Sequence, residues 1–386
     1  MNIVTRLTSW LERRWVNPAY VGWLLLGLAL FFFAAATNTL AGWLYVISGV
    51  MLALLIVAAL LPPRNLQALV VMRSHLPPVT AGTPLEIELL IRNPQRQPKG
   101  LFQVIDGLPV TLGGVQTTAV ERLPGGQTHQ WRYLVPTHRR GIYQWPRVDL
   151  RTAAPLGLFW CRRLIDAPAT AVVYPQVLPL QRCPLLDTLG ARQGQQWRYS
   201  PEAKADTQGV TRSLRPYRWG DPTRLIHWRT SARYGELRVR ELETMTASQE
   251  LMVALNTAAR WDEESFEQAV IAAASLYTYA LKQGFAAALW LPQATLRDRS
   301  QVMYSLAAVQ LDGSREGQRP APGQHTAAPP QGPTIWLTTQ GSQPISLAPG
   351  SRQVVWGGST ISDSALSSLS IDPALPLEAQ LQAHLV

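Results

Sequence analysis

Residues 19–61 read AYVGWLLLGLALFFFAAA, then TNT, then LAGWLYVISGVMLALLIVAALL, and they contain no charged side chain. At about 1.5 Å of rise per residue, the runs 19–36 and 40–61 each approach the roughly 30 Å hydrocarbon core of a bilayer as helices. The short polar segment between them, Thr37 to Thr39, allows only a tight turn. The stretch therefore predicts a transmembrane helical hairpin over 19–61, with both outer ends on one side of the membrane.

Positive charges flank this hairpin only at its outer ends. Arg6, Arg13 and Arg14 lie in the N-terminal segment 1–18, and Arg64 and Arg73 follow the second run. Because basic residues stay in the cytoplasm, we expect a two-pass protein of the inner membrane, with its N-terminus and the rest of the chain cytoplasmic. A signal peptide ending near 34–36 is one alternative, opposed by the second apolar run. A buried soluble hairpin is another, opposed by apolar residues on every face.

The overall charge is basic but is not by itself evidence of a nucleic-acid binder. The 386 residues include 35 Lys and Arg against 25 Asp and Glu, a net charge of +10, and only three of the bases are lysines. Arginine abundance follows genome base composition, so the clustering of arginines is the better criterion. Cys161 and Cys183 fit no metal or redox spacing, which excludes a disulfide scaffold and favours a reducing compartment.

Residues 66–178 have the pattern of an all-β domain. Leu85, Ile87, Leu89 and Ile91 alternate with polar residues, which is the period of a strand with one buried face. Further strands are expected at 101–105, 130–135, 142–150 and 170–174, with Gly- and Pro-containing turns between them. Short strands without intervening helices favour an immunoglobulin-like sandwich.

Residues 249–386 have a different pattern, typical of an α/β domain. A strand is expected at Gln249–Asn256, a helix from Asp262 to Gly284 and a second strand at Phe285–Leu291, which together form a βαβ unit and predict a parallel sheet. The helix should bury the stripe of Phe266, Val270, Ala273, Tyr277 and Leu281. Later strands are expected at 334–339 and 353–356, and the Gly-, Pro- and Gln-rich residues 312–333 predict a disordered insert.

The sequence indicates no catalytic residues and no cofactor. Its six histidines show no paired metal spacing, and it has no phosphate-binding loop, nucleophile elbow or dinucleotide fingerprint. Glu263 and Glu264 are paired carboxylates, but their place at a helix start is explained by the helix dipole. A hydrolase would need a nucleophile and a base that the sequence does not reveal.

Between the two domains, residues 179–248 hold a linker and an arginine-rich segment. Residues 212–240 carry eight arginines against Asp221 and Glu236, a net charge of +6. Trp219 to Pro222 predicts a turn, followed by a short helix that ends before Gly235 and carries Arg224, Trp228 and Ser231 on one face.

Four interpretations of this segment remain open. Asp221 and nearby acids pair with the arginines and lock the domains together, since Arg favours bidentate pairing. Alternatively the segment docks a protein, because Arg, Trp and Tyr are enriched at interface hot spots. Aromatic residues such as Tyr217 and Trp228 could instead stack on nucleic-acid bases. A phosphate-bearing lipid headgroup is the fourth ligand class.

The same segment resembles the signature of the domain-of-unknown-function 58 family. The residues that carry the resemblance are Arg215, Arg218, Gly220, Asp221, Arg224, Ile226, Trp228, Ser231, Ala232 and Arg233, followed by residues 237–243. Residues 140–143, 155–159 and 173–175 resemble further family landmarks. The resemblance implies a membrane hairpin, a β-domain, the signature and a von Willebrand factor A-like domain, in that order. It also implies association with MoxR-type AAA ATPases in assembling complexes. Many members have an acid where this chain has His227.

The resemblance further implies where a metal would bind and why none is expected. A von Willebrand factor A-like domain carries Asp-x-Ser-x-Ser after its first strand, and the matching positions here are Asn256, Ala258 and Arg260. Divalent Mg²⁺ needs several oxygen ligands, whereas here Asn256 offers only an uncharged amide oxygen, Ala258 offers none and Arg260 adds a cation. We therefore expect a metal-free domain, with the alternative that Asp262 or Glu263 supplies the ligands. The function expected is a non-enzymatic, membrane-anchored scaffold that docks protein partners; the alternative is a membrane-associated nucleic-acid- or phospholipid-binding protein.

Overall fold

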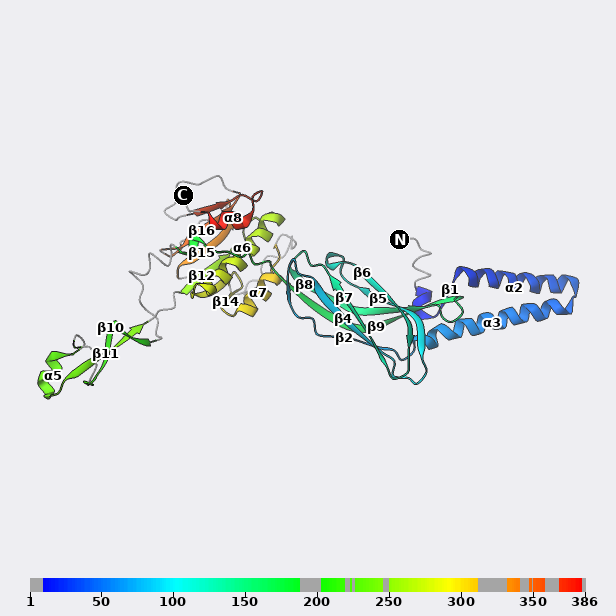
Figure 1. Ribbon diagram of the computed structural model, residues 1–386. Helices are drawn as coiled ribbons and strands as arrows, with labels where there is room; N and C mark the ends of the chain where they lie inside the picture. The colour runs from blue at the N-terminus through cyan, green and yellow to red at the C-terminus, as the bar shows by residue number, and fades with distance from the viewer. Residues whose placement is uncertain are drawn as a thin grey trace, which may run out of the picture. The chain divides into compact units, whose positions relative to one another are not determined.

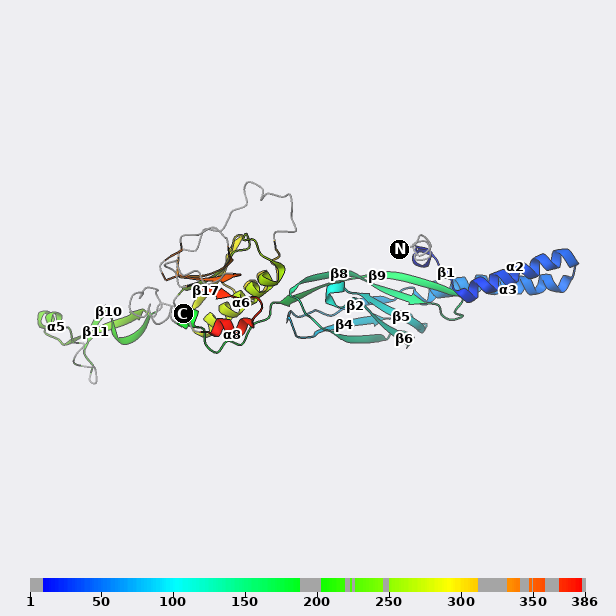
Figure 2. The same cartoon turned by 90° about the horizontal axis from the view of Figure 1, so that it is seen from above.

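The computed structural model describes residues 10–187, 203–218, 223, 226–245, 250–311, 332–340, 347–348, 350–357 and 368–383. The chain divides into two compact units, Met1–Pro175 and Gln176–Val386. The first contains two apolar helices and a β-sheet region, and the second contains an α/β region with a parallel sheet (Figures 1 and 2). This plan confirms the coarse fold expected from the sequence. Residues 312–331 of the expected insert lie outside the described residues.

Helices α2 (Tyr20–Thr39) and α3 (Gly42–Leu66) lie side by side (Figures 1 and 2). Both are long and apolar enough to cross a membrane, with mean hydropathies of 2.0 and 2.7, yet only 17% and 22% of these segments is buried. Small residues line the contact between them: Ala29 and Ala36 are fully buried, and the Ser48 hydroxyl donates to the Ala29 carbonyl at 3.0 Å. The remaining apolar surface is far larger than a soluble protein ordinarily exposes.

The ends of both helices differ from the expected ones. Helix α2 continues through the predicted turn at Thr37–Thr39, and the chain reverses at Leu40 and Ala41 instead. The hydroxyls of Thr37 and Thr39 donate back to the carbonyls of Ala34 and Ala35, at 2.7 and 2.8 Å, so these polar side chains are satisfied inside the helix.

Helix α3 does not end before its prolines either. It includes Pro62 and Pro63 and ends at Leu66, five residues later than expected. Tertiary contacts hold this last turn, because Leu66 is buried in the core of the β region and Asn65 hydrogen-bonds the backbone of Gly100. Those contacts outweigh the backbone hydrogen bonds that the prolines cannot make.

The β region consists of two sheets. The smaller is antiparallel, in the order β2-β4-β7, and consists of β2 (Val70–Arg73), β4 (Leu85–Arg92) and β7 (Thr128–Val135). The larger has the order β1-β9-β8-β5-β6, with β3 beside β9. Its strands are β1 (Asn17–Pro18), β3 (Val79–Thr80), β5 (Lys99–Gly107), β6 (Val115–Leu123), β8 (Gly141–Thr152) and β9 (Phe159–Tyr174).

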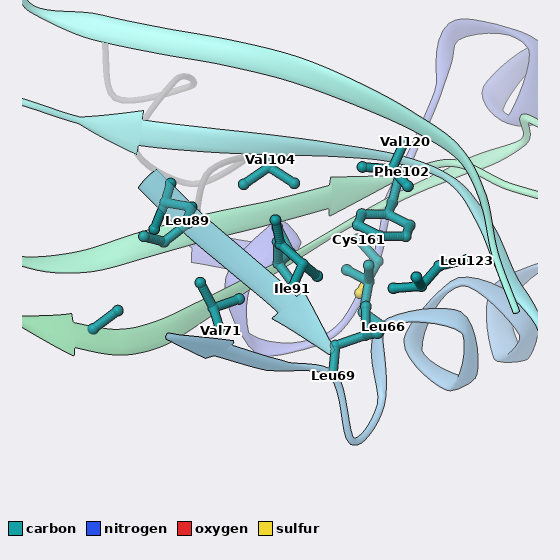
Figure 3. Packing of buried hydrophobic residues seen from close by; sticks show 13 residues of the cluster. Leu66, Leu69, Val71, Leu89, Ile91, Phe102, Val104, Val120, Leu123 and Cys161 are labelled. Atoms are coloured by element: carbon teal, nitrogen blue, oxygen red, sulfur yellow. The ribbon is translucent and has the colours of Figure 1, made fainter. Parts of the chain in front are cut away.

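Residues of both sheets form the apolar cluster shown in Figure 3. Val71, Leu89 and Ile91 come from the smaller sheet, and Phe102 and Val104 from the larger one. Leu66 and Leu69 enter the same cluster from the end of α3 and the residues after it, so the helix is joined to the β region by core packing (Figure 3). Burial of this kind contributes about 25 cal/mol per Å² of apolar surface removed from water.

All five strands expected in this region are present, and β2, β3 and β6 were not expected. Strand β6 reads VQTTAVERL and has only Val120 and Leu123 buried, so its sequence lacks a clear alternation of apolar residues. Strand β9 is much longer than the expected 170–174, because Phe159–Ala169 also pairs with β1 and β8.

The second unit has a six-stranded sheet in the order β14-β13-β12-β15-β16-β17, parallel except at β14. Strands β12 (Glu250–Leu255) and β13 (Ala286–Leu291) flank α6 (Glu263–Lys282), which is the predicted βαβ unit. The other elements of this region are β14 (Ala294–Leu296), α7 (Arg299–Ala308), β15 (Thr334–Thr339), β16 (Arg352–Trp356), β17 (Ser368–Ile371) and α8 (Leu377–Gln382).

Helix α6 is buried over most of its surface rather than along one stripe. Of the predicted stripe, Leu281 is 37% exposed, whereas the first four residues are buried. The residues after Pro175 cover part of the helix: the Leu178 amide donates to Ser275 Oγ at 2.9 Å, and the Tyr279 hydroxyl donates to Asp187 Oδ1 at 2.9 Å. The beginning of the expected linker is therefore packed structure.

The arginine-rich segment is built on a two-stranded antiparallel ribbon. Strand β10 (Ala203–Pro216) pairs with β11 (Arg238–Met245), and the short helix α5 (Trp228–Tyr234) lies at one end of the ribbon (Figure 1). Neither strand was expected, since the sequence here has no apolar alternation.

Candidate functional site

Helix α5 begins at Trp228 because His227 caps it. The His227 ring atom Nδ1 accepts a hydrogen bond from the Thr230 amide at 3.2 Å, and the Thr230 hydroxyl lies 2.7 Å from the same ring atom. This arrangement requires an unprotonated Nδ1, in a position where Asp or Asn usually caps a helix. Gly235, with φ of 73°, ends the helix.

Ser231 fixes α5 to the ribbon. Its side chain is only 6% exposed, and its hydroxyl oxygen accepts the Arg238 amide at 2.9 Å while donating to the His227 carbonyl at 3.1 Å. The His227 amide in turn donates to the Arg238 carbonyl at 2.8 Å. Buried Ile226 and Val239 pair across this junction, so the helix has a defined orientation on the ribbon.

The outer surface of this element combines exposed aromatic and basic side chains. Trp228 is 65% exposed, Tyr234 60% and Leu237 45%. Arg229 and Arg233 are exposed on the same helix. We call Trp228, Arg229, Arg233, Tyr234 and Leu237 the α5 surface. Arg238 stacks its guanidinium 4.5 Å from the Tyr234 ring centre, which holds that ring in place.

The structure brings together only part of the predicted signature site. Trp228, Ser231 and Arg233 lie on α5, whereas Arg215 and Arg218 lie at and just after the end of β10. Gly220, Asp221 and Arg224 lie outside the described residues, and so does the proposed pairing of Asp221 with arginines.

Trp228 and Ser231, which were predicted to share one face of the helix, differ in exposure. Ser231 is buried against the ribbon backbone and Trp228 points to solvent. The helix begins at Trp228 and has seven residues, and Ser231 at its middle is the residue that hydrogen-bonds to β11.

The positions expected for a degenerate metal site follow strand β12. Asn256 Oδ1 accepts the Ala258 amide at 3.2 Å, and Asn256 Nδ2 donates to Thr338 Oγ1 at 3.3 Å, so this side chain braces a turn. Arg260 is exposed. Asp262 caps α6 by accepting the Ser265 amide, and that hydrogen bond lowers the pKa of its carboxyl. Within the described residues, no three His, Cys, Asp or Glu side chains form a group that could hold a metal.

Neither cysteine has the environment of a nucleophile. Cys161 and Cys183 are both buried. Burial raises the pKa of Cys161, and it raises the pKa of Cys183 to about 11. At neutral pH both groups are thiols, whereas the thiolate is the reactive form.

One group of functional candidates was missed by the sequence analysis. Lys99 is 5% exposed and lines a pocket of about 600 Å³ together with Arg64 and Arg122. Arg64 is at the end of α3, Lys99 begins β5 and Arg122 lies in β6. Their positions are far apart in sequence, so no local motif could have indicated the group.

The chain thus has an apolar helical pair, a β region, a ribbon that presents basic and aromatic residues, and an α/β region. Residues 213–299 match the family described as "Protein of unknown function DUF58". The match includes α5, β11, β12 and α6, and it confirms the resemblance to this family that the signature residues indicated.

No curated protein matches the chain. Similar solved structures include a CARDB domain from Pyrococcus furiosus in complex with di-metal ions, which is 12% identical over 28% of this chain and 94% of that chain, with a TM-score of 0.20. A β-glucosidase from Listeria innocua in complex with gluconolactone is 13% identical over 27% of this chain and 16% of that chain, with a TM-score of 0.18. A Bifidobacterium adolescentis β-glucosidase is 11% identical over 30% of this chain and 19% of that chain, with a TM-score of 0.15. Likenesses this weak carry no argument about fold or function.

Proposed function

We propose that the protein is a non-enzymatic, membrane-anchored scaffold that docks a protein partner through the α5 surface. The observation that carries this proposal is the exposure of Trp228, Tyr234 and Leu237 beside Arg229 and Arg233. Aromatic residues and Arg dominate interface hot spots, whereas a soluble protein gains nothing from exposing a tryptophan. The two arginines favour a partner whose surface presents carboxylates.

The hairpin α2–α3 is the proposed anchor, in the inner membrane. Its apolar side chains face outward over most of both helices, which a lipid environment would satisfy. Tyr20 and Trp23 lie at the start of α2 and Trp43 and Tyr45 at the start of α3, and aromatic residues of this kind prefer the membrane interfaces. The basic residues outside the hairpin favour a cytoplasmic location for both units.

The two folded regions serve as the frame of this scaffold. The two packed sheets of the β region are compatible with an immunoglobulin-like sandwich. The parallel sheet around β12 is compatible with a von Willebrand factor A-like domain in which Asn256, Ala258 and Arg260 have replaced the metal ligands. A metal-free domain recognises its partner without a bridging ion, so the α5 surface would carry the specificity.

The family resemblance makes a MoxR-type AAA ATPase the partner to test first. Such an enzyme would supply the chemical energy for assembling complexes, and this chain would supply the membrane location and the docking site.

The second candidate function is nucleic-acid binding, which the same exposed aromatic and basic side chains favour. Trp228 and Tyr234 could stack on bases while Arg229 and Arg233 contact phosphates. Such binding would weaken steeply as the salt concentration rises, with a slope set by the number of phosphates contacted.

Co-purification with the full chain in mild detergent separates these functions. We expect at least one protein to be recovered with the wild type and lost with Trp228→Ala, but retained with Tyr304→Ala, which removes a 47% exposed aromatic side chain from α7. Identical sets of proteins from all three chains would contradict the docking proposal. Oligonucleotide binding that is salt-sensitive and lost with Trp228→Ala would establish the second candidate instead.

A further inference from the structure

A pocket lies where the end of α3 meets the β region. Its volume is about 600 Å³, a size that accommodates a small ligand. Leu61 and Arg64 line it from α3, Lys99 from β5, and Glu121 and Arg122 from β6. It belongs entirely to the first unit.

Lys99 is a buried cation that lines this pocket, and it forms no ion pair with any carboxylate of the described residues. The residue is 5% exposed, and its Nζ donates one hydrogen bond, to the Arg64 carbonyl at 2.6 Å. An ammonium group has three donors, and the carbonyl at a helix end supplies only a partial negative charge. Burial lowers the pKa of Lys99, which is the expected effect of taking a cation out of water. A nearby anion would offset that cost.

Two further cations surround the same space. Arg64 and Arg122 are exposed, and within the described part of the chain neither guanidinium forms an ion pair. Glu121 is the one acidic residue of the lining and is likewise not paired there, so the pocket has three positive side chains against one negative. Such an excess attracts an anion with several acceptor oxygens, since phosphates bind Arg and Lys well.

The pocket is held in a fixed geometry. Asn65 Nδ2 donates to the Gly100 carbonyl at 2.7 Å, and the Gly100 amide donates to Asn65 Oδ1 at 3.3 Å, so the last turn of α3 is clamped to β5. Gly100 lies so close to β6 that a Cβ atom there would be 2.6 Å from the Glu121 carbonyl oxygen. The three cations are therefore presented by elements that are fastened to one another.

The location of the pocket indicates which kind of molecule carries the anion. Leu61 is the last residue of the apolar run and Arg64 is the first charge after it, so on the proposed membrane placement of the hairpin the pocket is at the level of the lipid headgroups. Leu101 lines the pocket and is 64% exposed, and an acyl chain would cover such a side chain. We propose that this pocket binds the phosphate of an anionic phospholipid, with Lys99, Arg64 and Arg122 as its ligands. This inference rests on the proposed anchoring of α2 and α3.

The test uses the full chain purified in a neutral detergent. Short-chain phosphatidylglycerol, short-chain phosphatidylcholine and inorganic phosphate are titrated separately, and the unfolding temperature is followed by tryptophan fluorescence. We expect saturable stabilisation by phosphatidylglycerol, much weaker stabilisation by phosphate and none by phosphatidylcholine. Equal stabilisation by both lipids would overturn the proposal, and so would phosphate acting as strongly as phosphatidylglycerol.

Four variants locate the binding. Lys99→Met and Arg122→Gln should each raise the apparent dissociation constant for phosphatidylglycerol about tenfold or more, and Glu121→Gln should lower it. Arg92→Gln is the matched control. This exposed arginine lies opposite Val70 in the β2–β4 strand pair, close to the end of α3, but it does not line the pocket. The substitution should change the affinity less than about twofold. Arg122 is exposed, so its variant keeps the test valid if Lys99→Met fails to fold.

Carbonate washing of the source membranes distinguishes failure of the lipid site from failure of the proposed membrane anchor. A chain that stays in the washed membranes but does not bind phosphatidylglycerol contradicts this inference alone. A chain released by carbonate contradicts the anchor itself, and with it the lipid site.

Discussion

Arg73 and Asp106 join the two sheets of the β region through a buried, bidentate ion pair. The guanidinium of Arg73 donates to both carboxylate oxygens of Asp106, at 2.5 and 2.7 Å, and the two side chains are 4% and 0% exposed. The Tyr133 hydroxyl donates to the same carboxylate at 2.6 Å, and Arg73 also donates to the Ala167 carbonyl. Since Arg73 is on β2 and Asp106 on β5, the cluster bridges the sheets.

Removing the charge of Asp106 should therefore destabilise the protein strongly. Asp106→Asn leaves the Arg73 cation buried without a counter-charge, which typically costs about 3–5 kcal/mol. The loss is measured as a lower denaturation midpoint in detergent, followed by tryptophan fluorescence. Asp166→Asn is the control: it removes the 82% exposed partner of Arg147 and should leave the midpoint nearly unchanged. Equal effects of the two substitutions would refute the role assigned to the buried pair.

Glu88 should make stability depend on pH in the acid range. Hydrogen bonds from Ser74, Arg132 and Gln130 lower the pKa of its carboxyl to about 2, from an ordinary value of about 4.3. Because the folded-state pKa is depressed, the stabilisation is complete above about pH 5 and is lost as the pH falls toward 2. The midpoint difference between wild type and Glu88→Gln should be constant above pH 5 and shrink below it. A constant difference for Glu88→Gln down to pH 2 would contradict the prediction.

His227 should be replaceable by Asp but not by Ala. His227→Ala removes the acceptor for the Thr230 amide and should cost the local structure about 1 kcal/mol, whereas Asp is among the most favoured capping residues. Hydrogen exchange of the segment 226–234 measures the effect. We expect several-fold faster exchange in His227→Ala, with His227→Asp and the exposed-site control Arg229→Ala close to wild type. Unchanged exchange in His227→Ala would show that the cap is dispensable.

Much of the fold was predictable because burial leaves a periodic pattern in the sequence. Leu85 to Ile91 alternate in burial as they alternate in sequence, and the βαβ unit around α6 follows from two apolar strands and an acid-capped helix. The ribbon was not predictable, because its strands carry polar and charged residues with no apolar period. Helix α3 continues beyond Pro62 and Pro63 because Leu66 and Asn65 contact the β region. These contacts are visible only in the folded chain.

The candidate site was predictable in position but not in geometry. The density of arginines and aromatic residues indicated 212–240, and Trp228 and Arg233 lie on its exposed surface. Trp228 is exposed and Ser231 is buried. This difference depends on where α5 begins, which His227 sets by capping the helix. The pocket around Lys99 could not be predicted, because its cations come from three elements brought together only by folding.

The orientation of the hairpin can be tested with reporter fusions. We expect reporters at residues 1 and 386 to be cytoplasmic and a reporter inserted at the Leu40–Ala41 turn to be periplasmic, because the basic residues lie only outside the hairpin. A periplasmic C-terminus would contradict the two-pass anchor and favour a cleaved signal peptide.

The most direct measurement of the docking role is photo-crosslinking in intact cells. A photoreactive amino acid replaces Trp228 on the α5 surface or, as the control, Tyr304 on α7, and adducts are separated from washed membranes. The account predicts a discrete protein adduct from position 228 that is absent from position 304. No adduct at 228, or an adduct with nucleic acid instead of protein, would contradict it.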